Sequence, residues 1–322
     1  MSLPQALQGA VAAWLGRNAG DRRRASAALS ATYRAGGSSA GIDLGAYLVA
    51  RLPATFAAVR RVLAELARLR PDLAPASLLD AGSGPGTASW TAAEQWPELA
   101  AVTFLDTSGP FLALAAELAR HGPAPLALAA ALQCSIGQLP EGLAADLVIA
   151  AYALAELPEA RAAVIAGGLW RASRKALVLV EPGTPQGFAR LRAVRQRLIG
   201  EGAIPVAPCT HALACPIAGD DWCHFRVRLP RSRAHMQAKS ARVPFEDEPF
   251  AYLVLARDGA RPQGARIVAP PQHAKPGVTL RLCGEGRLET RLIARRDSAA
   301  YKQARKLDWG GILAPATKEE AP

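Results

Sequence analysis

The spacing of apolar residues divides the chain into a helical start, a region where strands alternate with helices, and a strand-rich end. In residues 45–70, apolar side chains recur at helical spacing, and Pro53 interrupts or restarts the run. We therefore expect a helical region over residues 1–72. From residue 73, helical patterns alternate with short apolar runs that suit buried strands, namely ASLLDA, AVTFLD, ADLVIAA and KALVLVE.

Strands that alternate with helices form right-handed βαβ units with a parallel sheet. Residues 73–204 are therefore predicted to form a doubly wound α/β domain. A cysteine-rich stretch over residues 205–245 reads as an insertion. Residues 246–322 contain further strand patterns, FAYLVLARD and a pair of strands around a Gly-Glu-Gly turn, which we expect to complete the sheet.

Composition narrows the class of partner. The chain has 322 residues, of which 50% are hydrophobic, so a sizeable core can form. Its net charge of +11 favours a polyanionic partner, nucleic acid first and an anionic membrane second, although a basic surface that is merely solvated is the alternative. No apolar run of membrane-spanning length is present, and the N-terminus does not resemble a signal peptide, so we expect no membrane association. Five cysteines, an odd number, favour the reducing cytoplasm.

A glycine-rich turn follows the first predicted strand. The stretch LLDAGSGPGT has three glycines at alternate positions, two residues after an acid, and a helix begins beyond them. The exposed N–H groups of such a turn favour a negatively charged or polar ligand. The spacing resembles motif I of class I S-adenosylmethionine-dependent methyltransferases, in which an acid at the end of the second strand holds the ribose. The matching residues are Asp80, Gly82, Gly84, Gly86 and Asp106. A turn that binds nothing is the alternative.

The catalytic residue is not identifiable from the sequence. Methyltransferases that act on the amino groups of bases typically carry an Asn/Asp-Pro-Pro-aromatic motif, but the corresponding stretch here is AYALAEL. Glu156 is a candidate base, although a carboxylate on a helix surface is the better interpretation. Pro208-Cys209 is similar to the Pro-Cys pair of cytosine-C5 methyltransferases, but it lies at the wrong place in the order of predicted strands.

Three of the five cysteines lie within 15 residues, in the stretch APCTHALACPIAGDDWCHF. With a fourth cysteine from the C-terminal strand pair they could surround one inorganic centre; these are Cys209, Cys215, Cys223 and Cys283. The irregular spacing and the lack of tight C-x2-C pairs favour a [4Fe–4S] cluster over zinc. Zinc, with His211 or His224 as alternative ligands, and four unligated thiols stay open. Cys134 is expected to be a small core residue.

Several stretches together resemble one family, the small-ribosomal-subunit methyltransferase-like family, which includes a mitochondrial ribosome-assembly factor and bacterial relatives. They are AYLVARLPATFAAV, LLDAGSGPGTASW, VEPGTPQGF, APCTHALACPI, DWCHF, EDEPFAYL and YKQARKLDWG. The resemblance covers nearly the whole chain from about residue 40 and implies a class I methyltransferase (Rossmann-like) fold. It also implies a [4Fe–4S] site on the four cysteines, S-adenosylmethionine at the glycine turn, and association with small-subunit ribosomal RNA during assembly.

The local charge agrees with an RNA partner, and no DNA partner is expected. Residues 171–242 hold 13 Lys and Arg against four Asp and Glu, in the same segment as three of the cysteines. Trp222, His224 or Phe225 could stack on unpaired bases if exposed. The arginines that we expect to contact RNA are Arg190, Arg192, Arg197, Arg226, Arg228, Arg231 and Arg233.

Three functions are compatible with these features. The first is an S-adenosylmethionine-dependent methyltransferase that acts on small-subunit ribosomal RNA. The second is a non-catalytic assembly or translation factor with a relic cofactor pocket. The third, a methyltransferase of small molecules, is disfavoured by the basic charge.

Overall fold

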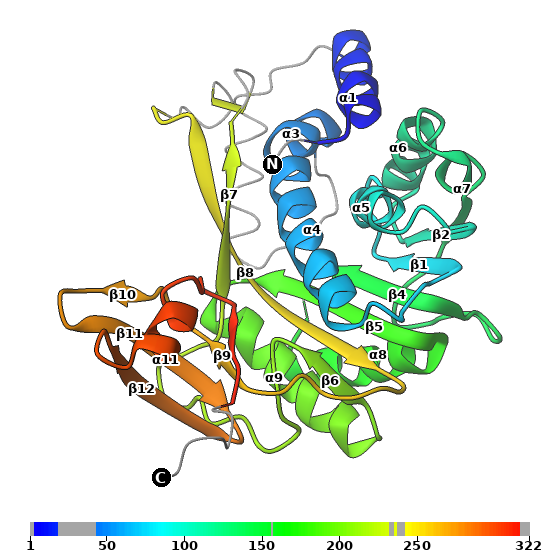
Figure 1. Cartoon of the computed structure of the whole chain (residues 1–322). Helices are drawn as coiled ribbons and strands as arrows, with labels where there is room; N and C mark the ends of the chain where they lie inside the picture. The colour runs from blue at the N-terminus through cyan, green and yellow to red at the C-terminus, as the bar shows by residue number, and fades with distance from the viewer. Residues whose placement is uncertain (1–2, 19–42, 156, 232–234, 237–241, 316–322) are drawn as a thin grey trace.

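The computed structural model describes residues 3–18, 43–155, 157–231, 235–236 and 242–315. These residues form two β-sheets, a large one flanked by helices and a small one near the C-terminus (Figure 1). Within this part of the chain, no helix combines the length and apolar character needed to cross a membrane.

The large sheet contains eight strands in the order β3-β2-β1-β4-β5-β8-β6, and β7 also pairs with β8. The first five strands of this order are parallel to one another, whereas β8 runs antiparallel to each of its partners. The order 3-2-1-4-5 is that of a Rossmann-like sheet. The strands are β1 (Ser77–Ala81), β2 (Ala101–Asp106), β3 (Ala130–Gln133), β4 (Ala145–Ala151), β5 (Ser173–Pro182), β6 (Ile204–Ala207), β7 (Phe225–Pro230) and β8 (Phe245–Ala256).

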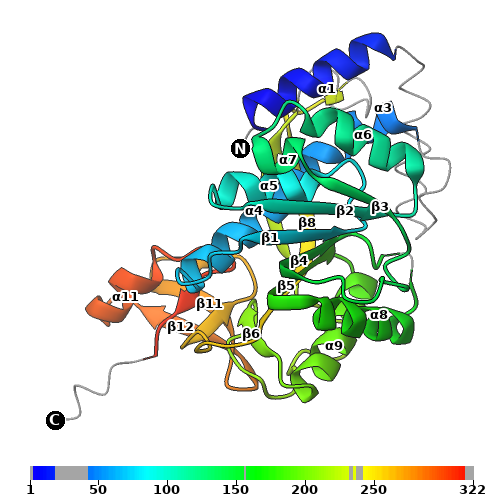
Figure 2. The same ribbon diagram turned by 90° about the vertical axis from the view of Figure 1, so that its right-hand side faces the viewer.

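Helices cover both faces of this sheet, as Figure 2 shows. On one face lie α1 (Gln5–Arg17), α3 (Leu44–Ala50), α4 (Leu52–Leu69), α5 (Thr87–Gln95), α6 (Gly109–Ala119) and α7 (Ala124–Ala127). On the other lie α8 (Glu159–Ala172) and α9 (Pro185–Gly200). The predicted doubly wound α/β arrangement is therefore confirmed.

Burial on both faces explains why the central strands are apolar at every position. In β5, Val178 and Val180 belong to the core under α4, while Leu177 and Leu179 belong to the core under α8 and α9. The short strand β3 is largely exposed, because it lies at the edge of the sheet and pairs only with β2.

The C-terminal strands differ from the expectation that they complete the large sheet. Only β8 joins it, because residues after 264 pair among themselves in a second sheet with its own small core. The elements of this second sheet are β9 (Ala265–Ile267), β10 (Gln272–His273), β11 (Gly277–Gly284), β12 (Arg287–Ala294), α11 (Ser298–Ala304) and β13 (Ile312–Leu313). The predicted strand pair around the Gly-Glu-Gly turn is the β11–β12 hairpin.

A buried arginine joins the two sheets. The side chain of Arg266, on β9, is 1% exposed and forms an ion pair with Glu65 on α4. Its Nε donates to the Pro208 carbonyl at 2.7 Å, and its Nη1 donates to the Gly310 carbonyl at 2.6 Å. One guanidinium thus connects α4, the start of the cysteine-rich loop and the C-terminal segment.

Replacing this arginine tests how strongly the two sheets depend on it. Arg266→Met leaves the Glu65 carboxylate buried with one partner fewer and leaves two carbonyls unbonded, so we expect the free energy of unfolding to fall by about 3 kcal/mol. Arg68, which also pairs with Glu65 but is 57% exposed, provides the control; Arg68→Ala should cost at most about 1 kcal/mol. Urea denaturation measures both, and equal losses would contradict the assignment.

Candidate functional site

The turn between β1 and α5 has a backbone conformation that glycine adopts easily and that other residues adopt only with strain. Gly82, Gly84 and Gly86 all have positive φ, at 74°, 51° and 76°. A Cβ added to Gly82 would come within 2.5 Å of the Ala153 Cβ, so the turn packs closely against the residues after β4. At Gly84 the nearest atom to an added Cβ is the Tyr47 hydroxyl, at 3.6 Å, because this glycine borders a cavity.

Asp80 supports the turn from behind. Its Oδ2 accepts hydrogen bonds from the Ser89 backbone N–H at 3.0 Å and from the Ser89 hydroxyl at 2.7 Å, which anchors the first turns of α5. Burial, aided by the nearby Asp106, raises the pKa of Asp80 to about 7. Asp80 and Gly86 are not among the residues that line the cavity, so they shape the turn from beneath.

A cavity of about 200 Å³ lies beside the turn, where the carboxyl ends of β1, β2 and β4 meet. Asp106 stands at its wall, where its Oδ2 accepts from the Gly84 N–H at 2.8 Å and its Oδ1 accepts from the Ser108 N–H at 2.9 Å. The predicted residues Gly82, Gly84 and Asp106 are thus brought together at one cavity.

The sequence patterns did not identify four further titratable residues that line this cavity. They are Tyr47 on α3, Cys134 after β3, Tyr152 after β4, and Arg161 on α8. Cys134, expected to be a small core residue, is half-buried: it packs against the core under α8 and α9 and also borders this cavity. Position at the carboxyl end of a parallel strand was the signal that could have identified Cys134 and Tyr152.

Tyr152 has a strained backbone conformation, of the kind that clusters at functional sites. Its φ of +61° is unusual for a bulky residue. Its hydroxyl donates to Glu248 Oε1 at 3.2 Å, and the Arg51 guanidinium lies 5.3 Å from its ring centroid. Because Arg51 also pairs with Glu248 at 3.1 Å, this wall of the cavity is fastened to β8.

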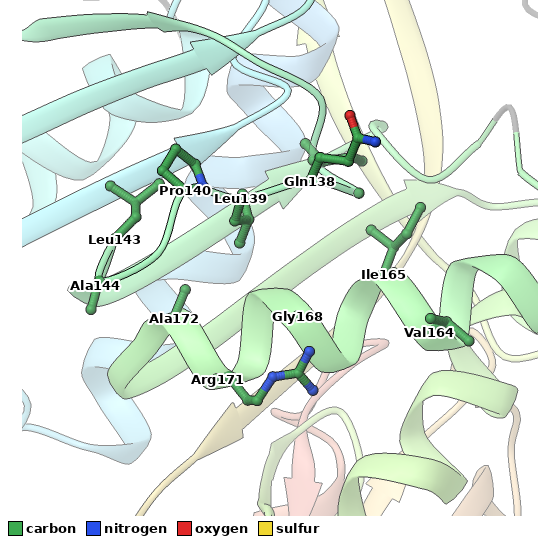
Figure 3. Close-up of a pocket in the computed structure, with 13 residues that line it drawn as sticks. Gln138, Leu139, Pro140, Leu143, Ala144, Val164, Ile165, Gly168, Arg171 and Ala172 are labelled. Atoms are coloured by element: carbon green, nitrogen blue, oxygen red, sulfur yellow. The ribbon is translucent and has the colours of Figure 1, made fainter.

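A larger groove of about 500 Å³ runs beside the cavity, between the loop after β3 and helix α8 (Figure 3). The two hollows share Ile136 and Ile165. Apart from Arg171 and Gln138, the groove is lined by apolar residues and glycines, and it has no carboxylate, histidine or thiol. It therefore lacks groups for acid–base or metal chemistry.

The four predicted ligand cysteines lie around one second cavity. Cys209, Cys215 and Cys223 are in the loop between β6 and β7, and Cys283 is on β11; all four line a cavity of about 40 Å³. All five cysteines are free thiols, and Cys134 lies elsewhere. The structure thus brings together sulfurs that are far apart in the sequence.

Arg195 on α9 organises the cysteine loop. Its Nε donates to the Cys209 sulfur at 3.2 Å, and its Nη2 donates to the carbonyls of His211 and Leu213 at 2.7 and 2.9 Å. From the other side, the β11–β12 turn approaches the loop so closely that a Cβ on Gly286 would lie 3.1 Å from Leu213. The loop is therefore clamped between α9 and the second sheet.

Of the four cysteines at this cavity, Cys283 is buried and the other three are half-buried. Burial, followed by repulsion from the other sulfurs, raises the pKa of Cys283 to about 12 and raises the pKa of Cys223 well above its usual value. In the described part of the chain, the Thr210 hydroxyl and His211 Nδ1 are buried without a hydrogen-bond partner. Among the same residues, no group of three or more His, Cys, Asp or Glu is arranged to hold a metal ion.

The predicted RNA-contacting arginines do not share one environment. Arg190 was expected to face solvent, which is wrong; it is 8% exposed, and its Nε donates to Glu181 Oε2 at 3.1 Å because that buried carboxylate needs a counter-charge. Arg231 is largely covered, beside Glu246, and Arg233 lies outside the described residues. The exposed members are Arg192, Arg197, Arg226 and Arg228.

Comparison with known proteins gives a family match over most of the chain. Residues 42–314 match the family described as mitochondrial small ribosomal subunit Rsm22. The human mitochondrial ribosome assembly protein METTL17 is 30% identical in an alignment of 303 residues, and this alignment covers 86% of this chain and 63% of that protein. The chain therefore spans less than two thirds of the length of this curated relative.

Solved methyltransferases are also similar in structure. Magnesium protoporphyrin IX methyltransferase from Synechocystis, with bound SAH, is 17% identical with a TM-score of 0.44, over 64% of this chain and 84% of that chain. The N-methyltransferase NodS from Bradyrhizobium japonicum is 13% identical with a TM-score of 0.40, over 62% and 87%. The Rossmann-like fold is therefore assigned from the strand order of the large sheet.

Because the pKa of Asp80 is raised, we expect the free energy of unfolding to depend on pH. Because the folded-state pKa, about 7, exceeds that of the unfolded chain, about 3.9, the folded protein holds this proton more tightly. The contribution of Asp80 to the free energy of unfolding should therefore fall as pH rises from about 4 to about 7. Asp80→Asn should flatten this decline, measured by urea denaturation at several pH values.

Asp146→Asn is the matched control for this measurement. Although burial opposes it, hydrogen bonds from the Ala76 N–H and from Lys175 lower the pKa of Asp146. The Asp146 carboxylate is consequently ionised in both states between about pH 5 and pH 7. Its removal should change stability without changing the pH slope, and an unchanged slope in Asp80→Asn would contradict the assignment. Glu181, whose pKa is also raised to about 7, by burial, remains in both variants.

Proposed function

The chain belongs to the mitochondrial small ribosomal subunit Rsm22 family, and from this membership we propose that it acts in the assembly of a small ribosomal subunit. In this role it binds S-adenosylmethionine beside the glycine turn, a [4Fe–4S] cluster on its four clustered cysteines, and ribosomal RNA on its exposed basic surface. The observation that carries the proposal is that one family match, over residues 42–314, includes both cavities.

The residues beside the glycine turn suit S-adenosylmethionine. The turn offers positive-φ glycines at Gly82 and Gly84, and Gly84 borders open space that a side chain would enter. Asp106 has the place at the end of β2 from which a carboxylate can accept hydrogen bonds from ribose hydroxyls. When bound, S-adenosylmethionine supplies a methyl group on a sulfonium centre. Tyr47 and Tyr152 help to exclude water from the same cavity.

Methyl transfer to ribosomal RNA is the second candidate function. The glycine turn is intact, as a working cofactor site requires. Of the carboxylates among the described residues, however, only Asp106 lines the cavity, and both its oxygens accept backbone hydrogen bonds. Glu156, the candidate base, lies outside the described residues, and the related METTL17 is named as a ribosome assembly protein, so assembly without turnover is the role that we propose first. The basic charge disfavours a small-molecule substrate.

The cysteine cavity suits a polynuclear cluster better than zinc. Four sulfurs line one hollow, and the sequence has none of the tight C-x2-C pairs on which structural zinc sites are usually built. The N–H of Arg195 already donates to one sulfur, and the buried Thr210 hydroxyl lies in the same loop in need of a partner. When bound, the cluster supplies a rigid inorganic centre that Cys209, Cys215, Cys223 and Cys283 would hold. The cytoplasm, which keeps thiols reduced, suits these free cysteines.

Loss of cofactor binding tests the first site. Gly84→Asp places a second carboxylate beside Asp106 at a positive φ, so we expect binding of S-adenosylmethionine, measured by calorimetry, to weaken by at least about 100-fold. Gly202→Asp, at another positive φ with no atom near its Cβ, controls for backbone strain and should bind normally. Normal binding by Gly84→Asp would contradict the site.

The same variant separates the two candidate functions in cells. We expect the deletion strain and the Gly84→Asp strain to accumulate immature small subunits, while mapping of their small-subunit ribosomal RNA shows every methyl group present. A methyl group that is missing from both and restored by the wild-type gene would instead establish the methyltransferase.

Metal content tests the second site. Cys283→Ser should lose iron and sulfide as fully as Cys215→Ser, because both sulfurs border the same cavity although one lies in the loop after β6 and the other on β11. Cys134→Ser, at the other cavity, is the control and should keep them. Anaerobically purified protein should absorb visible light at about 400 nm. A colourless protein with one zinc per chain would contradict the cluster.

A further inference from the structure

The segment from Trp222 to Arg228 has two faces of different character. Cys223 lines the cysteine cavity, and Phe225 and Val227 are buried in the core under α4. The alternate residues point the other way: Trp222 and His224 are half-buried, whereas Arg226 and Arg228 are exposed. Alternate residues of an extended chain lie on one face, so aromatic rings and arginines follow one another along about 20 Å.

A tryptophan from the C-terminal segment joins this face. The Trp309 ring lies edge-on to His224 with 5.1 Å between centroids, and His224 stacks on Trp222 at 5.2 Å with an interplanar angle of 20°. All three rings remain partly exposed. Trp222 is held in place because its Nε1 donates to the Gly183 carbonyl at 3.0 Å.

The arginines extend the aromatic row. The Arg226 guanidinium carbon lies 5.7 Å from the Trp309 centroid, and Arg228 lies 4.2 Å from the Phe245 centroid on the neighbouring strand. Arg228 also donates two hydrogen bonds to Asp247, at 2.7 and 2.8 Å. For Arg226, the described residues provide no ion pair within salt-bridge distance, so its charge is available to a ligand.

We propose that this face, Trp222, His224, Trp309, Arg226 and Arg228, is a platform for unpaired RNA. Flat rings with exposed area suit stacking on bases, and an arginine beside them suits phosphate or a further base. A duplex encloses the faces of its bases and cannot stack in this way. The inference rests on the proposed association with ribosomal RNA and narrows it to single-stranded segments.

The platform refines the expectation drawn from the sequence. Phe225 was one of three candidates for stacking, but its side chain is 5% exposed and points into the core, where its centroid lies 5.2 Å from that of Tyr252. Trp309, more than 80 residues away along the chain, takes the place beside His224. The alternative that the rings only pack the C-terminal segment predicts no preference between single-stranded and paired RNA.

Affinity for two RNAs tests the platform. The probes are an unstructured A-rich RNA of about 12 nucleotides and a blunt duplex of the same length, measured by fluorescence anisotropy at one salt concentration. We expect the single strand to bind at least about tenfold more tightly. Its binding should also quench the fluorescence of the half-buried Trp222 and Trp309, whereas Trp90, Trp96 and Trp170 are buried. Because Trp14 is half-buried as well, a smaller quench in Trp309→Phe assigns the signal to the platform.

Variants assign the effect to the named side chains. Trp309→Ala should weaken single-strand binding about tenfold, whereas Trp309→Phe, which keeps a ring, should recover much of it. Arg226→Ala should weaken binding and reduce the salt dependence by about one released counterion. Arg171→Ala, an exposed arginine on α8, is the control and should change affinity less than about twofold. His224→Ala is the second stacking variant, and thermal melting checks that each variant is folded.

The outcomes separate this inference from the proposed function. Equal affinity for duplex and single strand overturns the platform, as does unchanged single-strand binding in folded Trp309→Ala and His224→Ala. Co-sedimentation with small ribosomal subunits is measured in parallel. If wild-type protein co-sediments with small subunits but does not prefer single-stranded RNA, the platform is refuted and the proposed function is not. If wild-type protein does not co-sediment, the proposed function itself is refuted.

Discussion

Arg266 joins parts of the chain that are about 200 residues apart, and the position of the cysteine cavity depends on it. Its guanidinium is almost wholly buried, so its charge depends on acceptors from the protein, which among the described residues meet Nε and Nη1 but not Nη2. The acceptors are Glu65 in the N-terminal helical region, the Pro208 carbonyl next to the first clustered cysteine, and the Gly310 carbonyl. A charge in this environment tolerates few alternative arrangements, which places β9 and the second sheet against the large sheet.

Once the second sheet is so placed, the cysteine loop is confined from two sides. Arg195 holds it to α9, and the β11–β12 hairpin brings Cys283 to the cavity while Arg281 pairs with Asp221 of the loop. The loop then continues directly into β7. Cys223 lines the cysteine cavity and its half-buried neighbours Trp222 and His224 belong to the other face, so the proposed cluster site and the proposed RNA platform share one stretch of backbone.

The cavity beside the glycine turn depends on the large sheet in a similar way. The glycine turn, Asp106 and Tyr152 meet because parallel strands end at one edge. Tyr152 holds an unfavourable backbone conformation that its hydrogen bond to Glu248 helps to maintain. Glu248 lies on β8 directly opposite Val227 of β7, so the residue that holds Tyr152 and the strand that carries Arg226 and Arg228 are neighbours in the sheet.

The sequence by itself determined the alternation of strands and helices, the glycine turn, and the four cysteines as a group, because periodicity and spacing are local properties of the chain. Tertiary structure decided which side chains face which environment. Arg190 is buried because Glu181 lies under α9, and the strands after residue 264 form their own sheet because they pair with one another. Tyr47, Trp309 and Arg266 acquire their places from neighbours far away in sequence. Contacts of this kind depend on how the elements pack, and no local pattern records them.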